Sequence, residues 1–142
     1  MIPLRDNLPG GGPPPAALGL SAAVIATGLL LPGGNVWVAL ICGFGMYLFA
    51  PSVVRSIGEL GCLLTALLGG VIAAAVALLS SDPVGSWSAP AAVAAVAIAH
   101  LLLNRRSRII GLVPIPATAR IVSVPTISVV IGWAFIAAAL AV

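Results

Sequence analysis

The stretch LGCLLTALLGGVIAAAVALL, residues 60–79, contains no charged side chain and a single hydroxyl group, that of Thr65. A helix of about 20 apolar residues is long enough to cross the hydrocarbon core of a bilayer. Backbone N–H and C=O groups find no water there, so a crossing segment has to satisfy them internally as a helix. The stretch therefore predicts a transmembrane helix and indicates an integral membrane protein.

The composition of the whole chain points the same way. Of its 142 residues, 61% are hydrophobic and only 6% are charged, and the mean hydropathy is +1.25. A soluble domain of this size could not bury so much apolar surface. We therefore expect a protein of the bilayer, whose function is performed within or beside the membrane.

Proline, glycine and polar residues divide the chain into five apolar segments. The predicted fold class is all-α: a polytopic membrane bundle of five transmembrane helices in one domain, residues 16–142. It follows a cytoplasmic tail, residues 1–15, which is too rich in glycine and proline to be helical. The helices are expected at about 16–31, 36–50, 60–79, 89–103 and 121–142.

The charged residues predict an orientation. In the five-helix topology all six arginines fall on one side, and Asp82 is the charged residue on the other. The positive-inside rule then places the N-terminus in the cytoplasm and the C-terminus outside, in a bacterial inner (plasma) membrane. The arginines are Arg5, Arg55, Arg105, Arg106, Arg108 and Arg120. We interpret them as topological determinants or contacts to anionic lipids, because a clustered surface that reads nucleic acid is absent.

Small residues recur at helical spacing in the third segment. Such rows let helix backbones approach closely in lipid. We interpret them as packing inside the bundle and favour this over a dimerisation motif. The helix-packing candidates are Ala66, Gly69, Gly70, Ala73 and Ala74.

Two residues are candidates for contact with a partner protein. Trp133 lies in the middle of the last segment, where its indole N–H needs an acceptor. That acceptor lies either within the chain or on another protein, and the sequence leaves both options open. Arg5, in the N-terminal tail, is the second candidate.

Three other reactive side chains have a simpler interpretation. Cys42 and Cys62 lack the spacing of a metal or redox pair, so we expect them to be buried packing residues. His100 is an ionisable group inside an apolar segment, which suggests haem binding or proton relay. Without a second histidine or a buried acid, we favour a neutral, hydrogen-bonded packing histidine. No cofactor and no metal site are expected.

Three blocks of sequence resemble the rhomboid family of intramembrane serine proteases. The opening MIPLRDNLP, residues 1–9, resembles the cytoplasmic lead-in of bacterial members, and FAPSVVRSIG, residues 49–58, resembles the connection between their second and third helices. The run RRSRIIGLVPIP, residues 105–116, followed by RIVSVP, residues 120–125, and Gly132-Trp133, resembles their later loop and fifth helix. The blocks come in family order, and the resemblance implies a rhomboid-like scaffold.

The same resemblance implies that the catalytic groups are missing. The nucleophile motif of the family falls on Ser88-Ala89-Pro90-Ala91, so a proline without a hydroxyl replaces the serine. The residues that stabilise the oxyanion fall on Val38 and Cys42. The family's histidine base lies on a sixth helix, which the sequence up to Val142 does not include; whether the native protein has it is left open. We expect no catalytic residues and no enzyme activity.

The resulting hypothesis is a non-catalytic, rhomboid-like membrane protein that serves as an accessory or assembly subunit of a larger complex. The absence of lysine suggests a GC-rich bacterial genome, and an actinobacterial respiratory supercomplex is one complex to which we expect the chain to belong. The expected partners are other integral membrane proteins, in a hetero-oligomer, and membrane lipids, but no nucleic acid. Two alternatives stay open: a pseudoprotease that binds transmembrane clients, and a protease fragment that uses Ser86 or Ser88.

Overall fold

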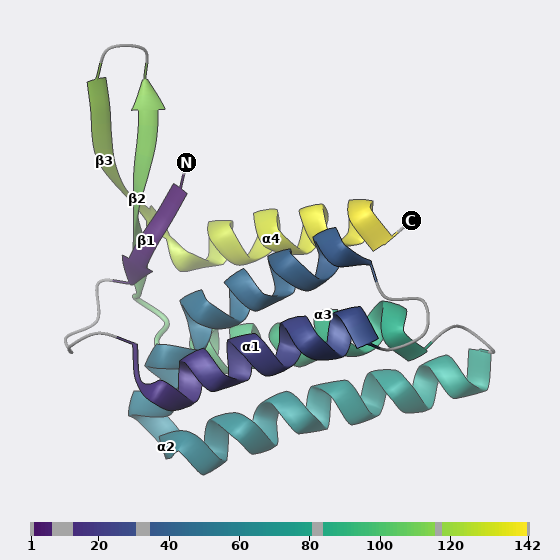
Figure 1. The fold of residues 1–142 in the computed structure, drawn as a ribbon. Helices are drawn as coiled ribbons and strands as arrows, with labels where there is room; N and C mark the ends of the chain where they lie inside the picture. Colours follow the sequence, from purple (N-terminus) through teal and green to yellow (C-terminus); the bar gives the residue numbers. More distant parts are fainter. Residues whose placement is uncertain (1, 7–12, 31–34, 81–83, 116–117, 142) are drawn as a thin grey trace.

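The computed structural model describes residues 2–6, 13–30, 35–80, 84–115 and 118–141. Within them, four helices run roughly along one direction, and a three-stranded sheet stands off from one end of the bundle (Figure 1). The predicted, predominantly helical fold is confirmed. In chain order the elements are β1 (Ile2–Asp6), α1 (Pro15–Leu30), α2 (Val36–Ser80), α3 (Val84–Leu103), β2 (Arg108–Ile115), β3 (Thr118–Pro125) and α4 (Thr126–Ala141).

Helix α2 consists of two helical halves that meet at Gly58. This residue has φ 79° and ψ 171°, a backbone conformation that is open almost only to glycine. The chain turns back at this point, so the two halves, residues 36–57 and 59–80, run side by side with the rest of the bundle (Figure 1). The second helix was expected to end near Pro51, which is wrong. Pro51 is buried, and the helix continues past it to the kink.

The core lies where α1, the first half of α2 and α3 meet. Met46, Phe49 and Val53 of α2 are fully buried, and Val93 and Val96 of α3 pack into the same cluster. Among the described residues, helix α4 contacts this core along one stripe. That stripe consists of Val129, Val130 and Trp133.

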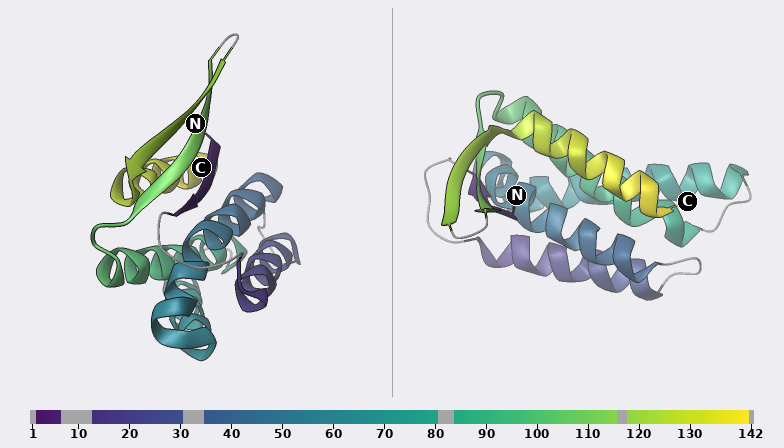
Figure 2. Two further views of the ribbon diagram at one scale, coloured as in Figure 1. Left: turned by 90° about the vertical axis from the view of Figure 1, so that its left-hand side faces the viewer. Right: turned by 90° about the horizontal axis from the view of Figure 1, so that it is seen from above.

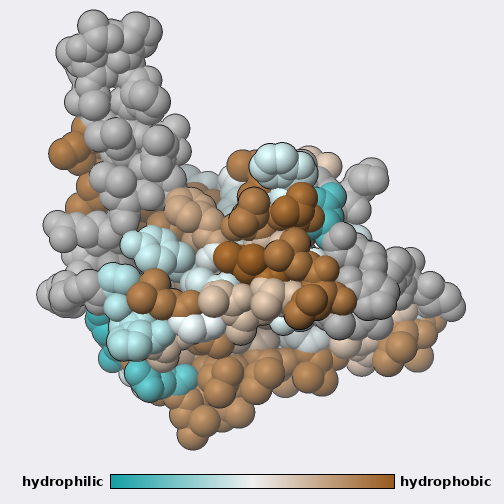
Figure 3. All heavy atoms as spheres, in the orientation of Figure 1, coloured by the Kyte–Doolittle hydropathy of each residue, from teal (hydrophilic) through white to brown (hydrophobic). Residues whose placement is uncertain are grey.

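The second half of α2 presents an apolar outer surface. Leu60, Leu68 and Leu79 are 68%, 62% and 87% exposed, and apolar side chains cover this part of the molecule in Figure 3. Among the described residues, α2 is the one helix that is both long and apolar enough to cross a membrane. Helices α1, α3 and α4 are apolar but contribute shorter apolar stretches.

The sheet was not expected from the sequence. Strands β2 and β3 form an antiparallel hairpin, and β1 pairs with β2 on its other side. Figure 2, turned to face this end of the molecule, shows the hairpin extending away from the helices. The N-terminal tail therefore contributes a strand, in which Arg5 lies opposite Ile110. Its side chain lies outside the described part of the structure, as do residues 7–12 of the tail.

The last helix begins later than expected. Residues 121–125 belong to strand β3, and α4 starts at Thr126, directly after Pro125. The run from Ile121 to Val124 contains three β-branched residues, which favour an extended backbone when a partner strand is present. The partner here is β2, whose Ile109 lies opposite Val124.

Replacement of Gly58 by alanine tests the kink. We expect Gly58→Ala to lower the free energy of unfolding by about 1–3 kcal/mol, because alanine is strained in this conformation. Gly132→Ala is the matched control, since a Cβ at either glycine meets no atom within 4 Å and only Gly58 has a positive φ. Thermal unfolding in detergent, followed by tryptophan fluorescence, measures the difference. Equal thermal midpoints for the two variants would contradict the requirement for glycine at the kink.

Candidate functional site

Two of the helix-packing candidates are neighbours in sequence but differ in their surroundings. A Cβ on Gly69 would lie 2.6 Å from the carbonyl oxygen of Ala91 and 2.7 Å from the Cβ of Ala95. A Cβ on Gly70 would have its nearest neighbours at 3.8 and 4.0 Å, which is ordinary contact. At Gly69, therefore, the second half of α2 packs directly against the backbone of α3. Of the other candidates, Ala66 is buried, and Ala73 and Ala74 are half-buried.

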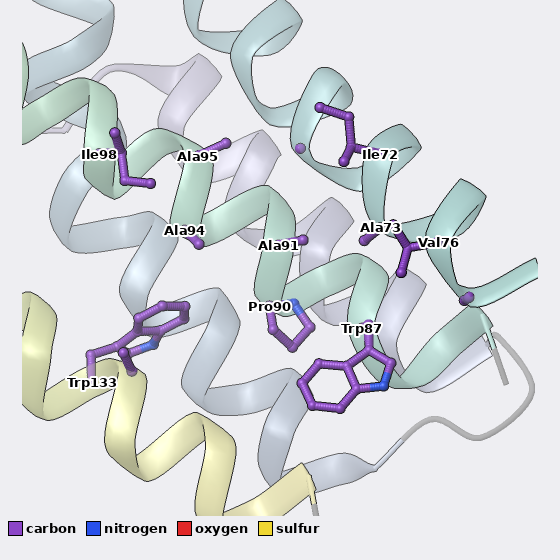
Figure 4. Close-up of a pocket in the computed structure, with 13 residues that line it drawn as sticks. Ile72, Ala73, Val76, Trp87, Pro90, Ala91, Ala94, Ala95, Ile98 and Trp133 are labelled. Carbon is purple, nitrogen blue, oxygen red and sulfur yellow. The ribbon is translucent and has the colours of Figure 1, made fainter. Parts of the chain in front are cut away.

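An apolar groove opens beside this contact. It has a volume of about 650 Å³ and lies between the second half of α2, α3 and α4. In Figure 4, α3 lies between the two other helices, and Trp133 on α4 is directed toward it. The groove is lined by Gly69, Ile72, Ala73, Val76, Ala77, Trp87, Pro90, Ala91, Ala94, Ala95, Ile98, Trp133 and Ala134. None of these side chains carries a charge.

Trp133 fixes one side of the groove. Its Nε1–H donates a hydrogen bond to the carbonyl oxygen of Ile41, at 3.2 Å, so the indole finds its acceptor within the chain. Gly45 makes room for the ring, because a Cβ there would lie 2.8 Å from Nε1. The side chain is half-buried and still lines the groove. It therefore attaches α4 to α2 and also contributes to the open surface.

Pro90, which replaces the nucleophile in the resemblance to rhomboids, lines the same groove. Nearby Ser88 is 8% exposed, and its Oγ has no hydrogen-bond partner among the described residues. The side chain of Ser86 lies outside the described part of the structure. Activation of a serine requires a base within hydrogen-bonding distance. The described structure provides no such base for Ser88.

His100 lies in a buried polar cluster at the opposite end of α3. Its Nδ1 contacts the hydroxyl of Ser52 on α2, and its Nε2 lies 2.8 Å from the hydroxyl of Ser107. Ser107 Oγ lies 2.7 Å from Oγ1 of Thr126, the first residue of α4. His100 and Thr126 are 0% and 1% exposed. The cluster therefore joins α2, α3 and α4 away from water.

For a neutral imidazole, the donors and acceptors of the cluster have one consistent order. Ser52 donates to the carbonyl oxygen of Phe49, so it accepts from His100 Nδ1–H. In a neutral imidazole Nε2 is then an acceptor, and the hydroxyl of Ser107 donates to it. Thr126 in turn donates to Ser107. The contacts are therefore compatible with a neutral, hydrogen-bonded histidine. The sequence predicted that role but neither Ser52 nor Ser107, which lie 48 and 7 positions from His100 along the chain. It also did not predict Thr126, the partner of Ser107, which lies 19 positions further on.

The part of the chain that the structure describes brings no cluster of metal ligands to these sites. Within the described ranges, no group of three His, Cys, Asp or Glu side chains is placed to hold a metal ion. Cys42 and Cys62 are both buried and free. Comparison with family models, curated proteins and solved structures finds no match to this chain. The groove and the His100 cluster are therefore the features from which a function has to be inferred.

Substitution of His100 tests the buried cluster. We expect His100→Phe to lower the free energy of unfolding by about 1–3 kcal/mol, because the ring is kept while the acceptor of the Ser107 hydroxyl is lost. Thr27→Val is the control, since that exposed hydroxyl bonds only within its own helix, to the carbonyl of Ala23 at 2.8 Å. The control should stay within about 0.5 kcal/mol of the parent in thermal unfolding. A similar loss in both variants would argue against the cluster.

The adjacent glycines of α2 offer a second comparison. Gly69→Ala should destabilise the protein by about 1–3 kcal/mol, because the new methyl group meets the backbone of α3. Gly70→Ala should be neutral or stabilising by up to about 1 kcal/mol, because alanine favours the helix and has room. Thermal midpoints of the two variants in the same detergent measure this difference in stability. The opposite order would show that α2 and α3 do not pack through Gly69.

Proposed function

We propose that this chain is a non-catalytic, rhomboid-like membrane protein that acts as an accessory or assembly subunit by receiving a helix of a partner membrane protein. The observation that carries the proposal is the uncharged groove of about 650 Å³ between α2, α3 and α4. The helices that form its sides are held together by contacts within the chain. The groove is therefore already formed before a partner helix binds.

The proposal includes a multi-pass arrangement in the bilayer. Each half of α2 is about 22 residues long, which suits one crossing, and α1, α3 and α4 add three further apolar helices. Arg55, Arg105, Arg106 and Arg108 belong to the end of the bundle that carries the sheet, whereas exposed Trp37 belongs to the other end. This separation supports a cytoplasmic location for the charged end in a bacterial inner membrane.

A transmembrane helix is the occupant that the groove lining supports best. Ala91, Ala94 and Ala95 of α3 are half-buried, and their small side chains let another backbone approach closely. Within a bilayer, helices associate by such packing, because lipid tails are as apolar as the side chains. Trp87 on α3 and Trp133 on α4 add larger apolar contacts. A charged or strongly polar ligand would find no matching group.

The position of Pro90 supports the non-catalytic part of the proposal. The resemblance places the serine nucleophile at this position, and here the pyrrolidine ring lines an apolar wall. His100 is engaged with Ser52 and Ser107 in a separate cluster. The proposed scaffold therefore retains the packing of a helical bundle but uses its surface for association.

Co-purification in a mild detergent tests the proposal. The native chain should elute with a stoichiometric integral membrane protein, and Ala94→Leu, which fills the groove, should reduce that yield by about tenfold. Ala75→Leu is the matched control, because Ala75 is exposed on α2 and does not line the groove. The thermal midpoint of each variant shows whether the fold is intact.

The outcomes separate the hypotheses. A chain that elutes alone would contradict a subunit role, and equal losses in both variants would contradict the groove. Transient crosslinks to many different membrane proteins would favour the alternative of a client-binding pseudoprotease. Cytochromes in the eluate would identify the larger complex as a respiratory supercomplex. Membership of such a complex stays a prediction.

A further inference from the structure

A second, smaller cavity of about 270 Å³ lies at the charged end of the bundle, between the end of α3 and the start of α4. It shares no lining residue with the apolar groove. Its lining combines a guanidinium group and two hydroxyl groups with three apolar side chains. These residues are Arg105, Ser107, Thr126, Leu101, Pro125 and Ile127.

The polar wall of this cavity is held by the His100 cluster. Ser107 and Thr126 are 6% and 1% exposed, and their hydroxyl oxygens lie 2.7 Å apart. With Ser107 donating to His100, the hydroxyl hydrogen of Thr126 can turn from Ser107 to a ligand oxygen. The bond between Ser107 and His100 is then kept, and a charge-assisted bond to the ligand replaces the one between Thr126 and Ser107. Arg105 is exposed, lines the same cavity and adds N–H donors. The cavity therefore offers donors to an anion.

The charge around the cavity favours the same class of ligand. Exposed Arg55, Arg106 and Arg108 lie at this end of the bundle, and exposed Glu59 is an acidic residue there. Asp6 of β1, which lies opposite Ile109, is a second acidic residue, and its side chain lies outside the described part of the structure. An excess of positive charge attracts anions to such a surface. The planar guanidinium of Arg105 matches two oxygens of a phosphate group at once.

The apolar residues extend from the cavity along α4. Ile127 lines it and is 55% exposed, and Ile131, one helical turn further, is 51% exposed. Residues four positions apart share a helix face, so together they form an aliphatic strip that begins at the polar cavity. A phosphate group with attached acyl chains matches this order of surfaces. A free phosphate would leave the strip uncovered.

We propose that this cavity binds the phosphodiester group of an anionic membrane phospholipid. Arg105 and Thr126 donate to the phosphate oxygens, and an acyl chain lies along Ile127 and Ile131. The inference rests on the proposed embedding of the helices in a bilayer. It does not depend on which protein occupies the apolar groove.

Lipid-dependent stability of the full chain in a neutral detergent tests this site. Dioleoyl phosphatidylglycerol should raise the thermal midpoint in a saturable way, and dioleoyl phosphatidylcholine should do so far less. Arg105→Gln should raise the concentration of phosphatidylglycerol for half the effect by at least about tenfold, because a charge-assisted hydrogen bond is lost. Arg106→Gln is the matched control and should change it by less than about twofold. Arg106 is exposed and next in sequence but does not line the cavity.

Four results would overturn the proposal. They are equal losses in the two variants, equal effects of the two lipids, no saturable effect in the parent chain, and full stabilisation by glycerol 3-phosphate, which would indicate a soluble phosphate ester. Carbonate extraction of membranes distinguishes a failure of the lipid-site proposal from a failure of the proposed function. A chain released by carbonate contradicts the embedding itself, whereas an embedded chain without the Arg105 effect contradicts only the lipid site.

Discussion

The charged end of the bundle depends on the hydrogen-bond chain from Thr126 through Ser107 and His100 to Ser52. This chain links α4 to α3 and α3 to the first half of α2. Its members are almost fully buried, so an unpaired group among them could not be satisfied by water. Further along α4, Val129, Val130 and Trp133 pack on the core, and Trp133 donates a hydrogen bond to the carbonyl oxygen of Ile41. The cluster therefore supports both the side of the apolar groove and the wall of the smaller cavity.

Two glycines of α2 shape the other side of the groove, for opposite reasons. Gly58 has open space around it and is required for its backbone conformation, which turns the helix back. Gly69 has ordinary helical geometry and is required for its lack of a side chain, because α3 lies directly against it. The first sets the direction of residues 59–80, and the second sets their distance from α3. Together they leave a groove whose floor consists of small residues.

The sequence predicted the helical character of the chain, because apolar runs and the residues that interrupt them are local properties. It misplaced boundaries where distant contacts override local preference. Pro51 did not end its helix, since the surrounding bundle accommodates the buried ring. Residues 121–125 joined a strand, because β2 supplies their backbone partners. The pairing of β1 with β2 joins segments about 100 residues apart, a separation that no local pattern reveals.

Composition and the spacing of small residues were enough to predict a chain of apolar helices and to place Gly69 among five helix-packing candidates. Trp133 was identified because its indole N–H lies in the middle of an apolar segment. Whether Trp133 would satisfy its indole within the chain was decided by Gly45 and Ile41, which come to it from another helix. The partners of His100 and both cavities were likewise decided by tertiary structure. A groove or a buried hydrogen-bond chain exists only between segments that are distant in sequence. Its geometry follows from how closely those segments pack.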